Sequence, residues 1–340
     1  MNSTVIGIDI AKRVFQLYWV DIETGEIVSL QLKREKFLAY FVNRQPCLIG
    51  MEACGGAQHW ARELIKLGHE VKLLAGKFVK SFVMGNKSDA ADAKAIWIAV
   101  QQPGVKPIAI KTEQQQAILA LHRMRQGLIK VRTMQVNALR GLLTEYGEVM
   151  PQGKAGLRKG IAVALERTAE RLPGIVIEAL REQWQRIIEL DTQMVEIERK
   201  LQSWLKSNLA AKAIANIPGV GLLTATAAVA TMGDAKAFRS GREFAAWVGL
   251  VPKQTGTGGK TRLLGISKRG DTYLRTLLIH GARSVLMHAK QPGAWVDELG
   301  KRRPSNVVVV ALANKMARTI WAILAHELAY QGDWVSIKPA

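Results

Sequence analysis

The sequence contains little cysteine and no long uninterrupted run of apolar residues. Its 340 residues include two cysteines, Cys47 and Cys54, which are too few for a disulfide framework and lack the spacing of a zinc site. The first nine residues have neither the basic region nor the cleavage site of a signal peptide. No stretch reaches the roughly 18 apolar residues of a membrane span. We therefore expect a protein of the reducing cytoplasm that has no membrane partner.

Acidic side chains are also in the minority. The chain has 48 Lys and Arg against 28 Asp and Glu, a net charge of +20. Hydrophobic residues make up 48% of it, enough to form a core, which excludes a disordered polybasic tail. The positive charge favours a polyanionic partner, nucleic acid first of all. Charge alone does not identify the function, because ribosomal and architectural proteins share this balance.

The first third of the chain has the pattern of a mixed α/β domain. Short runs of β-branched and aromatic residues predict strands, and amphipathic segments between them predict helices. Strands in a cluster, followed by alternating strands and helices, favour a single sheet domain over 1–110. The expected strands are 5–9, 14–20, 26–32, 47–51 and 70–74, and the expected helices are 35–43 and 57–67.

From about residue 113 the pattern becomes that of long amphipathic helices. One of them is expected over 175–207, as part of an antiparallel helical hairpin or coiled-coil spacer. Residues 149–160 are rich in Pro, Gly and Lys and are typical of a linker. The expected parts are this spacer over 111–209 and a mostly helical C-terminal domain over 210–340, with one Gly- and Lys-rich loop at 252–270.

Four carboxylates occur where a metal site would need them. Asp9 and Glu52 lie in apolar strands, where an uncompensated carboxylate is costly, and Asp89 and Asp92 are spaced to share one face of a helix. Four neighbouring acids need a counter-charge, which hard divalent cations supply. Two Mg²⁺ ions roughly 3.5–4 Å apart serve phosphodiester chemistry, and acids at a first strand, a later strand and a following helix suit a ribonuclease-H-like sheet.

Each acid taken alone also has a structural interpretation. Asp89 could cap a helix, Asp9 could end a strand, and Glu52 could pair with a neighbouring Lys. The combination of all four in one sheet-and-helix layout favours the metal site.

Two glycine-containing segments near the C-terminus are suited to phosphate contacts. The turn Ile217-Pro-Gly219-Val-Gly221 has the pattern of a helix-hairpin-helix, in which Gly219 and Gly221 let backbone N–H groups approach phosphate; a plain interhelical turn is the alternative. Residues 253–303 carry 11 Lys and Arg against 3 acids, which a solvated basic face would also explain. They include glycines beside hydroxyls but no P-loop spacing. The candidate contacts are Lys253, Lys260, Arg262, Ser267, Lys268 and Arg269.

Together these motifs resemble the DEDD transposases of bacterial insertion sequences, relatives of the Piv-type DNA invertases. The resemblance follows the family's order over nearly the whole chain. It is carried by Gly7-Ile-Asp9-Ile-Ala-Lys12, Met51-Glu52-Ala53, Ser88-Asp-Ala-Ala-Asp92, Ile217-Pro-Gly-Val-Gly221, Gly249-Leu-Val-Pro-Lys-Gln254 and Ile266-Ser-Lys-Arg-Gly-Asp271.

The resemblance implies a RuvC-like N-terminal domain, a coiled-coil spacer and a C-terminal transposase domain. It implies that Asp9, Glu52, Asp89 and Asp92 bind Mg²⁺, two ions per site, and that a hydroxyl from another protomer of a dimer or tetramer attacks DNA and becomes covalently attached. It also implies that a structured guide RNA (a bridge or seeker RNA) from the element's own non-coding end pairs with donor and target DNA.

The nucleophile is where the sequence departs from the family pattern. The family nucleophile is commonly a Ser five residues after the Pro of Gly-Leu-x-Pro, and counting from Pro252 that position is Thr257. A threonine hydroxyl can attack phosphorus, but its β-branch makes it bulkier and stiffer. Thr255 and Ser267 remain alternatives.

Two other functions are compatible with parts of the sequence. A RuvC-like Holliday-junction resolvase, a nuclease that uses water as its nucleophile, would not need the long C-terminal half. A non-catalytic nucleic-acid scaffold would leave four acids in a basic protein unexplained. The function that the resemblance implies, and that we expect, is an RNA-guided DNA transposase.

Overall fold

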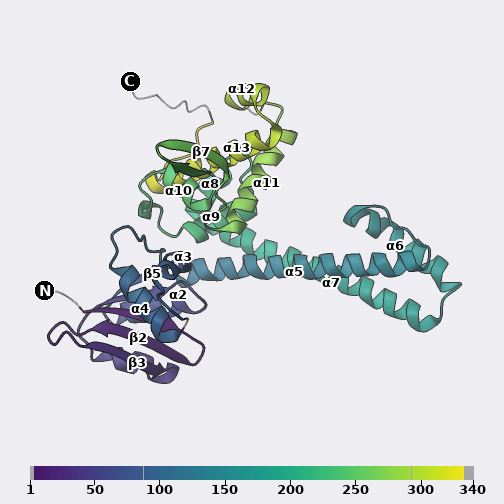
Figure 1. Ribbon diagram of the computed structural model, residues 1–340. Helices are drawn as coiled ribbons and strands as arrows, with labels where there is room; N and C mark the ends of the chain where they lie inside the picture. Colours follow the sequence, from purple (N-terminus) through teal and green to yellow (C-terminus); the bar gives the residue numbers. More distant parts are fainter. Residues whose placement is uncertain (1–3, 87, 292, 333–340) are drawn as a thin grey trace. The chain divides into compact units, whose positions relative to one another are not determined.

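The computed structural model describes residues 4–332 except residues 87 and 292, and it contains two compact units. The N-terminal unit ends at Thr112 and the C-terminal unit begins at Glu113 (Figure 1). Each unit has its own hydrophobic core, and each is described below by itself.

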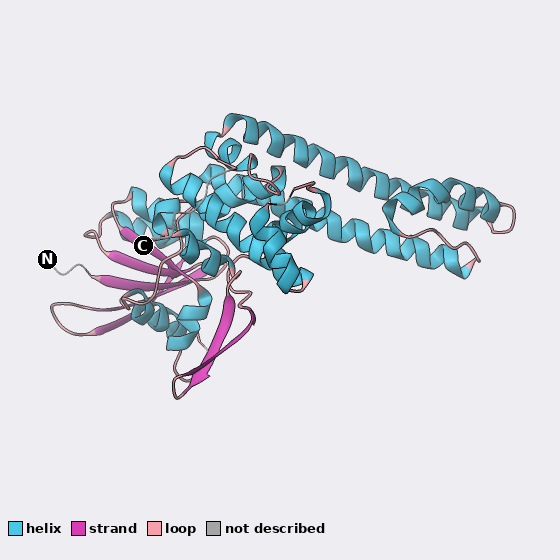
Figure 2. Cartoon of the chain, turned by 90° about the horizontal axis from the view of Figure 1, so that it is seen from above, coloured by secondary structure: helices cyan, strands magenta, loops and turns pink. Residues whose placement is uncertain are grey.

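The N-terminal unit is built on a five-stranded mixed sheet with the order β3-β2-β1-β4-β5 (Figures 1 and 2). Strand β1 pairs antiparallel with β2 and parallel with β4, so the two strands that carry the predicted acids are neighbours in the middle of the sheet. The prediction of an α/β domain of the ribonuclease-H (RuvC-like) type is confirmed, and each expected strand is present to within one residue at either end. The strands are β1 Val5–Ile10, β2 Val14–Val20, β3 Ile27–Lys33, β4 Leu48–Glu52 and β5 Glu70–Leu74.

The helices of this unit pack on the sheet. Phe15 of β2 makes edge-to-face contacts with Phe37 and Trp60, at ring centroid distances of 4.6 and 5.2 Å, which holds α1 and α2 against one face. Helix α4 packs on β1 and β4 at two glycines. The helices are η1 Arg34–Lys36, α1 Phe37–Val42, α2 Ala57–Lys66, α3 Gly76–Val79, η2 Lys80–Phe82 and α4 Asp89–Val100.

The contact of α4 with the sheet depends on glycine. A Cβ atom at Gly7 of β1 would overlap the Ala93 carbonyl oxygen and the backbone nitrogen of Trp97. A Cβ atom at Gly50 of β4 would lie 2.8 Å from the Cβ atom of Val100. Protein interiors have no spare volume for such atoms. The two glycines therefore allow α4 to lie closer to the sheet than any other residue type would permit.

The C-terminal unit begins with three helices, of which the longest two lie side by side (Figures 1 and 2). Ion pairs join these two, from Arg125 to Glu198 at 2.7 Å and from Arg132 to Asp191 at 3.0 Å. The helix expected over 175–207 is present. The linker expected over 149–160 is wrong, because a helix begins at Gly153 and buries Leu157 and Ile161. The three helices are α5 Glu113–Glu145, α6 Gly153–Ala169 and α7 Gly174–Ser207.

The rest of the C-terminal unit is a helical bundle that carries an exposed β-hairpin. The hairpin replaces the loop expected over 252–270. The Gly258–Gly259 pair explains the hairpin, because both residues have positive φ angles, 56° and 79°, as a two-residue hairpin turn requires. The elements are α8 Leu209–Ala215, α9 Leu222–Met232, η3 Ala235–Ala237, α10 Gly241–Val248, β6 Pro252–Thr257, β7 Lys260–Ile266, α11 Thr272–His288, α12 Ala294–Arg302 and α13 Ser305–His326.

A buried polar cluster joins α5 to this bundle. His122 of α5 lies 2.9 Å from the Tyr273 hydroxyl of α11 and 3.0 Å from the Thr226 hydroxyl of α9. Burial, together with the positive charge of Arg125, lowers the pKa of His122 to about 4. The imidazole is therefore neutral at physiological pH and acts as a hydrogen-bonding link between three helices.

Helix α13 is long and apolar enough by composition to cross a membrane. One side of it, including Leu312, Met316 and Ile320, is buried in the core of the C-terminal unit against α10 and α11. These contacts are typical of the central helix of a soluble bundle.

We predict that Gly7→Ala disrupts the N-terminal unit. The added methyl group must displace the backbone of α4, which we expect to lower the free energy of unfolding by about 3 kcal/mol. Urea unfolding followed by tryptophan fluorescence measures this effect. Gly104→Ala is the matched control, because no atom lies within 4 Å of its added Cβ. Equal stability of the two variants would contradict the close contact.

Candidate active-site acids and phosphate-binding hairpin

Asp9 and Glu52 are neighbours across two parallel strands. The register pairs Ile8 of β1 with Met51 of β4, so the acids occupy the next position on each strand. Side chains alternate between the faces of a sheet, which puts Asp9 on the face of Gly7 and Glu52 on the face of Gly50. This is the face on which α4 lies. The carboxyl ends of both strands therefore direct an acid toward the side of the sheet covered by α4.

Glu52 also packs against the backbone of a later segment. A Cβ atom at Gly76, the first residue of α3, would overlap the Glu52 carboxylate oxygen Oε1. The backbone N–H of Ala53 donates to the Leu74 carbonyl oxygen at 2.8 Å, which continues the pairing of β4 with β5 beyond Glu52. The Glu52 side chain thus lies against the start of α3 and is only partly exposed.

Asp89 and Asp92 lie in the first turn of α4. The residue that caps this helix is Ser88, whose hydroxyl accepts a hydrogen bond from the Ala91 N–H at 3.2 Å. The capping role considered for Asp89 is therefore taken by its neighbour. Asp92 directly precedes Ala93, whose carbonyl oxygen lies against Gly7, so the start of α4 is held close to the end of β1. Acids are favoured at a helix N-terminus by its partial positive charge.

The electrostatics of Asp9 show that the other three acids act on this carboxyl. Burial, and then the negative charges of Asp92, Asp89 and Glu52, raise the pKa of Asp9 from 3.8 to about 6. The neighbouring Cys54 responds in the same way: burial and the charges of Glu52 and Asp9 raise the pKa of its thiol. The fold thus gathers negative charge in a protein whose net charge is +20.

The donor set fits a hard divalent cation. All four groups are carboxylates, the ligands that Mg²⁺ and Ca²⁺ prefer, and their mutual repulsion is what a cation would relieve. Among the residues that the structure describes, no three His, Cys, Asp or Glu side chains are close enough to form a complete ligand cluster. The chemistry and the electrostatics therefore support a cation at this end of the sheet, and the structure gives no coordination geometry.

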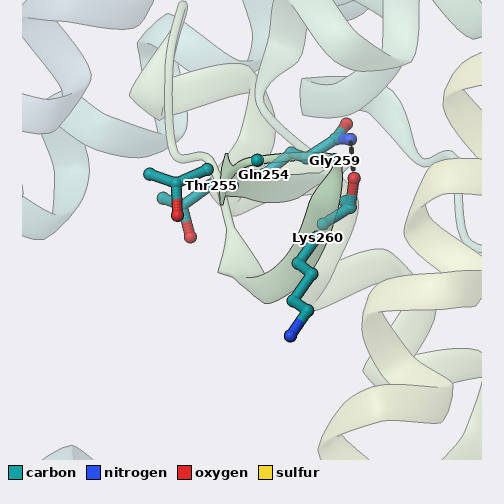
Figure 3. Close-up of a pocket in the computed structure, with 8 residues that line it drawn as sticks. Gln254, Thr255, Gly259 and Lys260 are labelled. Atoms are coloured by element: carbon teal, nitrogen blue, oxygen red, sulfur yellow. Dashed lines mark hydrogen bonds between the residues drawn. The ribbon is translucent and has the colours of Figure 1, made fainter.

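The C-terminal candidates gather on and beside the β6–β7 hairpin. Thr257 ends β6 next to the Gly258–Gly259 turn and pairs with Lys260, while Thr255 pairs with Arg262. All four side chains are exposed. Residues 254–261 surround a hollow of about 290 Å³ at the tip (Figure 3). Thr255 and Thr257 are therefore both accessible to a large substrate.

Ser267, the third candidate nucleophile, lies at the base of the hairpin and differs in accessibility. Its hydroxyl oxygen is buried and has no hydrogen-bond partner among the residues described. Its N–H donates to the Val251 carbonyl oxygen at 2.8 Å, which fixes this backbone beside the other strand. An attack by Ser267 on DNA would need the base of the hairpin to open, so the geometry favours the two threonines.

Backbone contacts fix the base of the hairpin. A Cβ atom at Gly270 would overlap the Trp247 carbonyl oxygen, so the chain entering the hairpin touches the chain leaving it. The buried guanidinium of Arg275 donates to the carbonyl oxygens of Val248 and Arg269 at 2.9 and 3.1 Å. Lys268, whose φ angle is 53°, donates its N–H to the Gly249 carbonyl oxygen. The Lys268 and Arg269 side chains remain exposed on this fixed backbone.

The two glycines of the α8–α9 turn have different environments. Gly219 has a positive φ of 83°, and a Cβ atom there would lie 2.7 Å from the Gly281 carbonyl oxygen of α11. Close packing against α11 thus accounts for Gly219. Gly221 is exposed at the start of α9, with no atom within 4 Å of a Cβ built on it. Of the two, Gly221 is the one with space for a phosphate.

Sequence reasoning missed the residues that position the acids. Gly7 and Gly50 each stand two residues before an acid on the same strand face, and Gly76 makes room for Glu52. The repeated pattern Gly-x-Asp and Gly-x-Glu was the available signal. It indicates an element packed against the sheet directly beside each carboxylate.

Comparison with known proteins agrees with this architecture. Residues 6–148 match the DEDD-type transposase model of the IS110 group, which covers the acid-bearing sheet and α4. Residues 211–295 match the model described as "Transposase IS116/IS110/IS902 family", which covers the α8–α9 turn and the hairpin.

Several relatives match over nearly the whole chain. A probable family 20 transposase of Pseudomonas aeruginosa is 44% identical over 97% of this chain and 99% of its own length. The transposase for insertion sequence element IS1328 of Yersinia enterocolitica is 38% identical, over 95% of this chain and 97% of its own. The transposase for IS1111A of Coxiella burnetii is also 38% identical, over 96% and 91%. The resemblance to the DEDD transposases is confirmed: this chain belongs to the IS116/IS110/IS902 family of transposases, enzymes of DNA recombination.

Proposed function

We propose that this transposase cuts and rejoins DNA by transesterification at a site where Asp9, Glu52, Asp89 and Asp92 hold divalent cations. The observation that carries the proposal is the raised pKa of Asp9, which burial raises first and the charges of Asp92, Asp89 and Glu52 raise further. Mg²⁺ is the cation of choice, two ions per site, because the ligands are all carboxylates. When bound, it would supply Lewis-acid stabilisation of the charge that develops on the phosphate oxygens.

Thr257 is the proposed nucleophile. Its hydroxyl is exposed at the tip of the hairpin, beside Lys260. In the step we propose, Oγ1 of Thr257 bonds to phosphorus while the bond from phosphorus to one deoxyribose oxygen breaks. The proton lost by the threonine ends on that deoxyribose oxygen. The protein–DNA bond is itself a phosphodiester of similar energy to the one that is broken. The hydroxyl of a second DNA end can therefore attack it, release Thr257 and join a new strand.

The other partners of the reaction are donor and target DNA, a structured guide RNA and further copies of this chain. A net charge of +20 suits the binding of several nucleic-acid backbones at once. Base pairing by a guide would supply the sequence choice, leaving the protein to recognise backbone and shape. We propose that Thr257 of one protomer serves the acids of another in a dimer or tetramer, and that the reaction takes place in the cytoplasm.

A junction resolvase with water as the nucleophile is the second candidate. The acid-bearing sheet alone would be enough for that chemistry. The exposed hydroxyls on a firmly based hairpin favour the covalent route, because hydrolysis by water gives them no role. The two functions differ in one product, the covalent protein–DNA adduct.

We predict that Asp9→Asn stabilises the metal-free protein. The folded state holds the Asp9 proton more tightly than the unfolded chain, since the pKa is about 6 rather than 3.8. The carboxylate therefore costs stability above pH 6, and this cost disappears as the pH falls toward 4. The expected gain at neutral pH is about 1 kcal/mol, a value reduced for the half-exposed carboxyl. Urea unfolding in EDTA measures it.

The same unfolding experiment also tests whether the acids bind Mg²⁺. Millimolar Mg²⁺ should raise the unfolding midpoint of the wild-type protein and leave that of Asp9→Asn unchanged. Glu23→Gln, an exposed acid in the β2–β3 turn, is the control and should respond to Mg²⁺ like the wild type. An equal Mg²⁺ effect on Asp9→Asn and wild type would contradict the metal site.

We predict that Thr257→Ala abolishes the covalent protein–DNA adduct and that Thr257→Ser retains it, because only the hydroxyl is required. The assay mixes the purified protein and its copurifying RNA with DNA carrying the ends of the element, denatures the mixture, and detects DNA that migrates with protein. Peptide mapping then identifies the attached residue.

Thr255→Ala and Ser267→Ala are the matched controls and should keep the adduct. Thr257→Ala should copurify with the same RNA as the wild type, which separates loss of chemistry from loss of assembly. An adduct that survives Thr257→Ala contradicts the assigned nucleophile. Nicked DNA without any adduct favours the resolvase, and the absence of a discrete RNA contradicts the guide.

A further inference from the structure

The β6–β7 hairpin has two chemically different faces. Directly paired residues of an antiparallel ladder share a face, and every second residue returns to it. The pairs Thr255–Arg262 and Thr257–Lys260 therefore lie on one face, which we term the hydroxyl–cation face. The other face carries the uncharged pairs Gln254–Leu263 and Gly256–Thr261. Both hydroxyls and both cations of the tip thus point to the same side.

Both cations of the hydroxyl–cation face are accessible to a ligand. Lys260 and Arg262 are exposed, and in the described parts of the chain neither of them forms an ion pair. In Figure 3 the Lys260 side chain extends outward on the same side as the Thr255 hydroxyl. On the opposite face, Gln254 donates to the Thr261 hydroxyl at 3.4 Å, a local contact that uses its polar groups. The unsatisfied charge of the hairpin tip is therefore confined to one face.

The spacing on this face matches a phosphodiester. Directly opposite side chains on an antiparallel pair have Cβ atoms about 4.5–5.5 Å apart, and diagonal neighbours are about 7–8 Å apart. Lys260 is opposite Thr257, and Arg262 is its diagonal neighbour on the same face. A phosphate in contact with the Thr257 hydroxyl would thus be within reach of both cations. A guanidinium can bind two phosphate oxygens at once, while an ammonium acts as a point charge.

Contacts at the base of the hairpin hold its backbone, and with it the hydroxyl–cation face, in one position. The backbone contact at Gly270 and the two hydrogen bonds from the Arg275 guanidinium fix the chain where it enters and leaves the hairpin. Asn314 of α13 adds a hydrogen bond to the Leu250 carbonyl oxygen at 3.2 Å. A preorganised face loses little conformational entropy when it binds, so the cations and the hydroxyl approach a phosphate together.

We propose that the hydroxyl–cation face binds the backbone of the DNA strand that is cut. Lys260 and Arg262 act there as positioning residues, which hold the non-bridging oxygens of the scissile phosphate beside Thr257. This proposal rests on the proposed role of Thr257 for the identity of the phosphate. The binding of DNA by this face is independent of that role. The opposite face consists of the pairs Gln254–Leu263 and Gly256–Thr261, with Leu263 65% exposed. None of these four residues carries a charge that could form an ion pair with a phosphate.

The salt dependence of DNA binding tests the face without any chemistry. The double variant Lys260→Gln/Arg262→Gln removes two phosphate contacts, so the slope of log K against log salt for duplex DNA should fall by about 1.8 in magnitude. Thr261→Ala on the opposite face should leave the slope unchanged. Lys301→Gln, an exposed lysine paired with Glu298 on α12, controls for loss of charge. An unchanged slope in the double variant, or an equal change with Lys301→Gln, would overturn the proposal.

The same titration with single-stranded RNA identifies the ligand. A slope that falls for duplex DNA and stays unchanged for RNA supports the assignment to DNA. A slope that falls for RNA alone would overturn it. Thr257→Ala should keep the wild-type slope on DNA, so loss of the nucleophile and loss of the face are separate results.

Adduct formation tests the positioning role. At saturating DNA, Arg262→Gln should slow the appearance of the adduct by tenfold or more, since the lost contact matters most as charge develops on the phosphate. Arg262→Lys should recover part of the rate, and Thr261→Ala should have the wild-type rate. An adduct mapped to Thr255 would refute the proposed nucleophile but leave the face in place. An unchanged rate in Arg262→Gln, or an adduct at Ser267, would overturn the positioning role.

Discussion

The close contact between α4 and the glycines of β1 and β4 is the constraint on which the acid site depends. Without a side chain at Gly7 or Gly50, the backbone of α4 lies directly on the sheet. The first turn of α4 is thereby held beside the ends of both strands. Four carboxylates then share one electrostatic field, and the pKa of Asp9 records the cost. The fold accepts this local destabilisation, which is typical of a functional site.

Close backbone contacts at glycines also occur in the C-terminal unit. There the backbone contacts at Gly249 and Gly270 fix the two ends of a hairpin whose strands are exposed except at Ile266. In the N-terminal unit, glycine contacts gather negative charge; at the hairpin, they support hydroxyls and positive charge. In the function we propose, they supply the complementary parts that phosphoryl transfer needs, a centre for cations and a surface for phosphate with a nucleophile. Family membership agrees with both, since the two matching family models cover the two regions separately.

Much of the fold and part of the site could be predicted from the sequence. The strands that carry Asp9 and Glu52 were predicted because buried strands leave a strong local pattern, and an acid inside such a pattern is conspicuous. The helix that begins at Gly153 was missed because Arg158, Lys159 and Gly160 separate its buried residues Leu157 and Ile161, so tertiary packing outweighs local propensity. The hydroxyl–cation face was also missed, because which side chains share a face depends on strand register, and register appears only once the pairing is known.

The pKa of the Asp9 carboxyl is the most direct measure of the central claim that four acids converge. It can be followed by NMR in full-length protein with ¹³C-labelled aspartate, in the absence of divalent cations. We predict a pKa near 6 in the wild type and a lower, still raised pKa in Asp92→Asn, because burial remains and Asp92 is the strongest of the charges that oppose ionisation. Asp21, in the β2–β3 turn, should titrate identically in both proteins. An ordinary pKa for Asp9 in the wild type, or a raised one that Asp92→Asn leaves unchanged, would contradict the convergence.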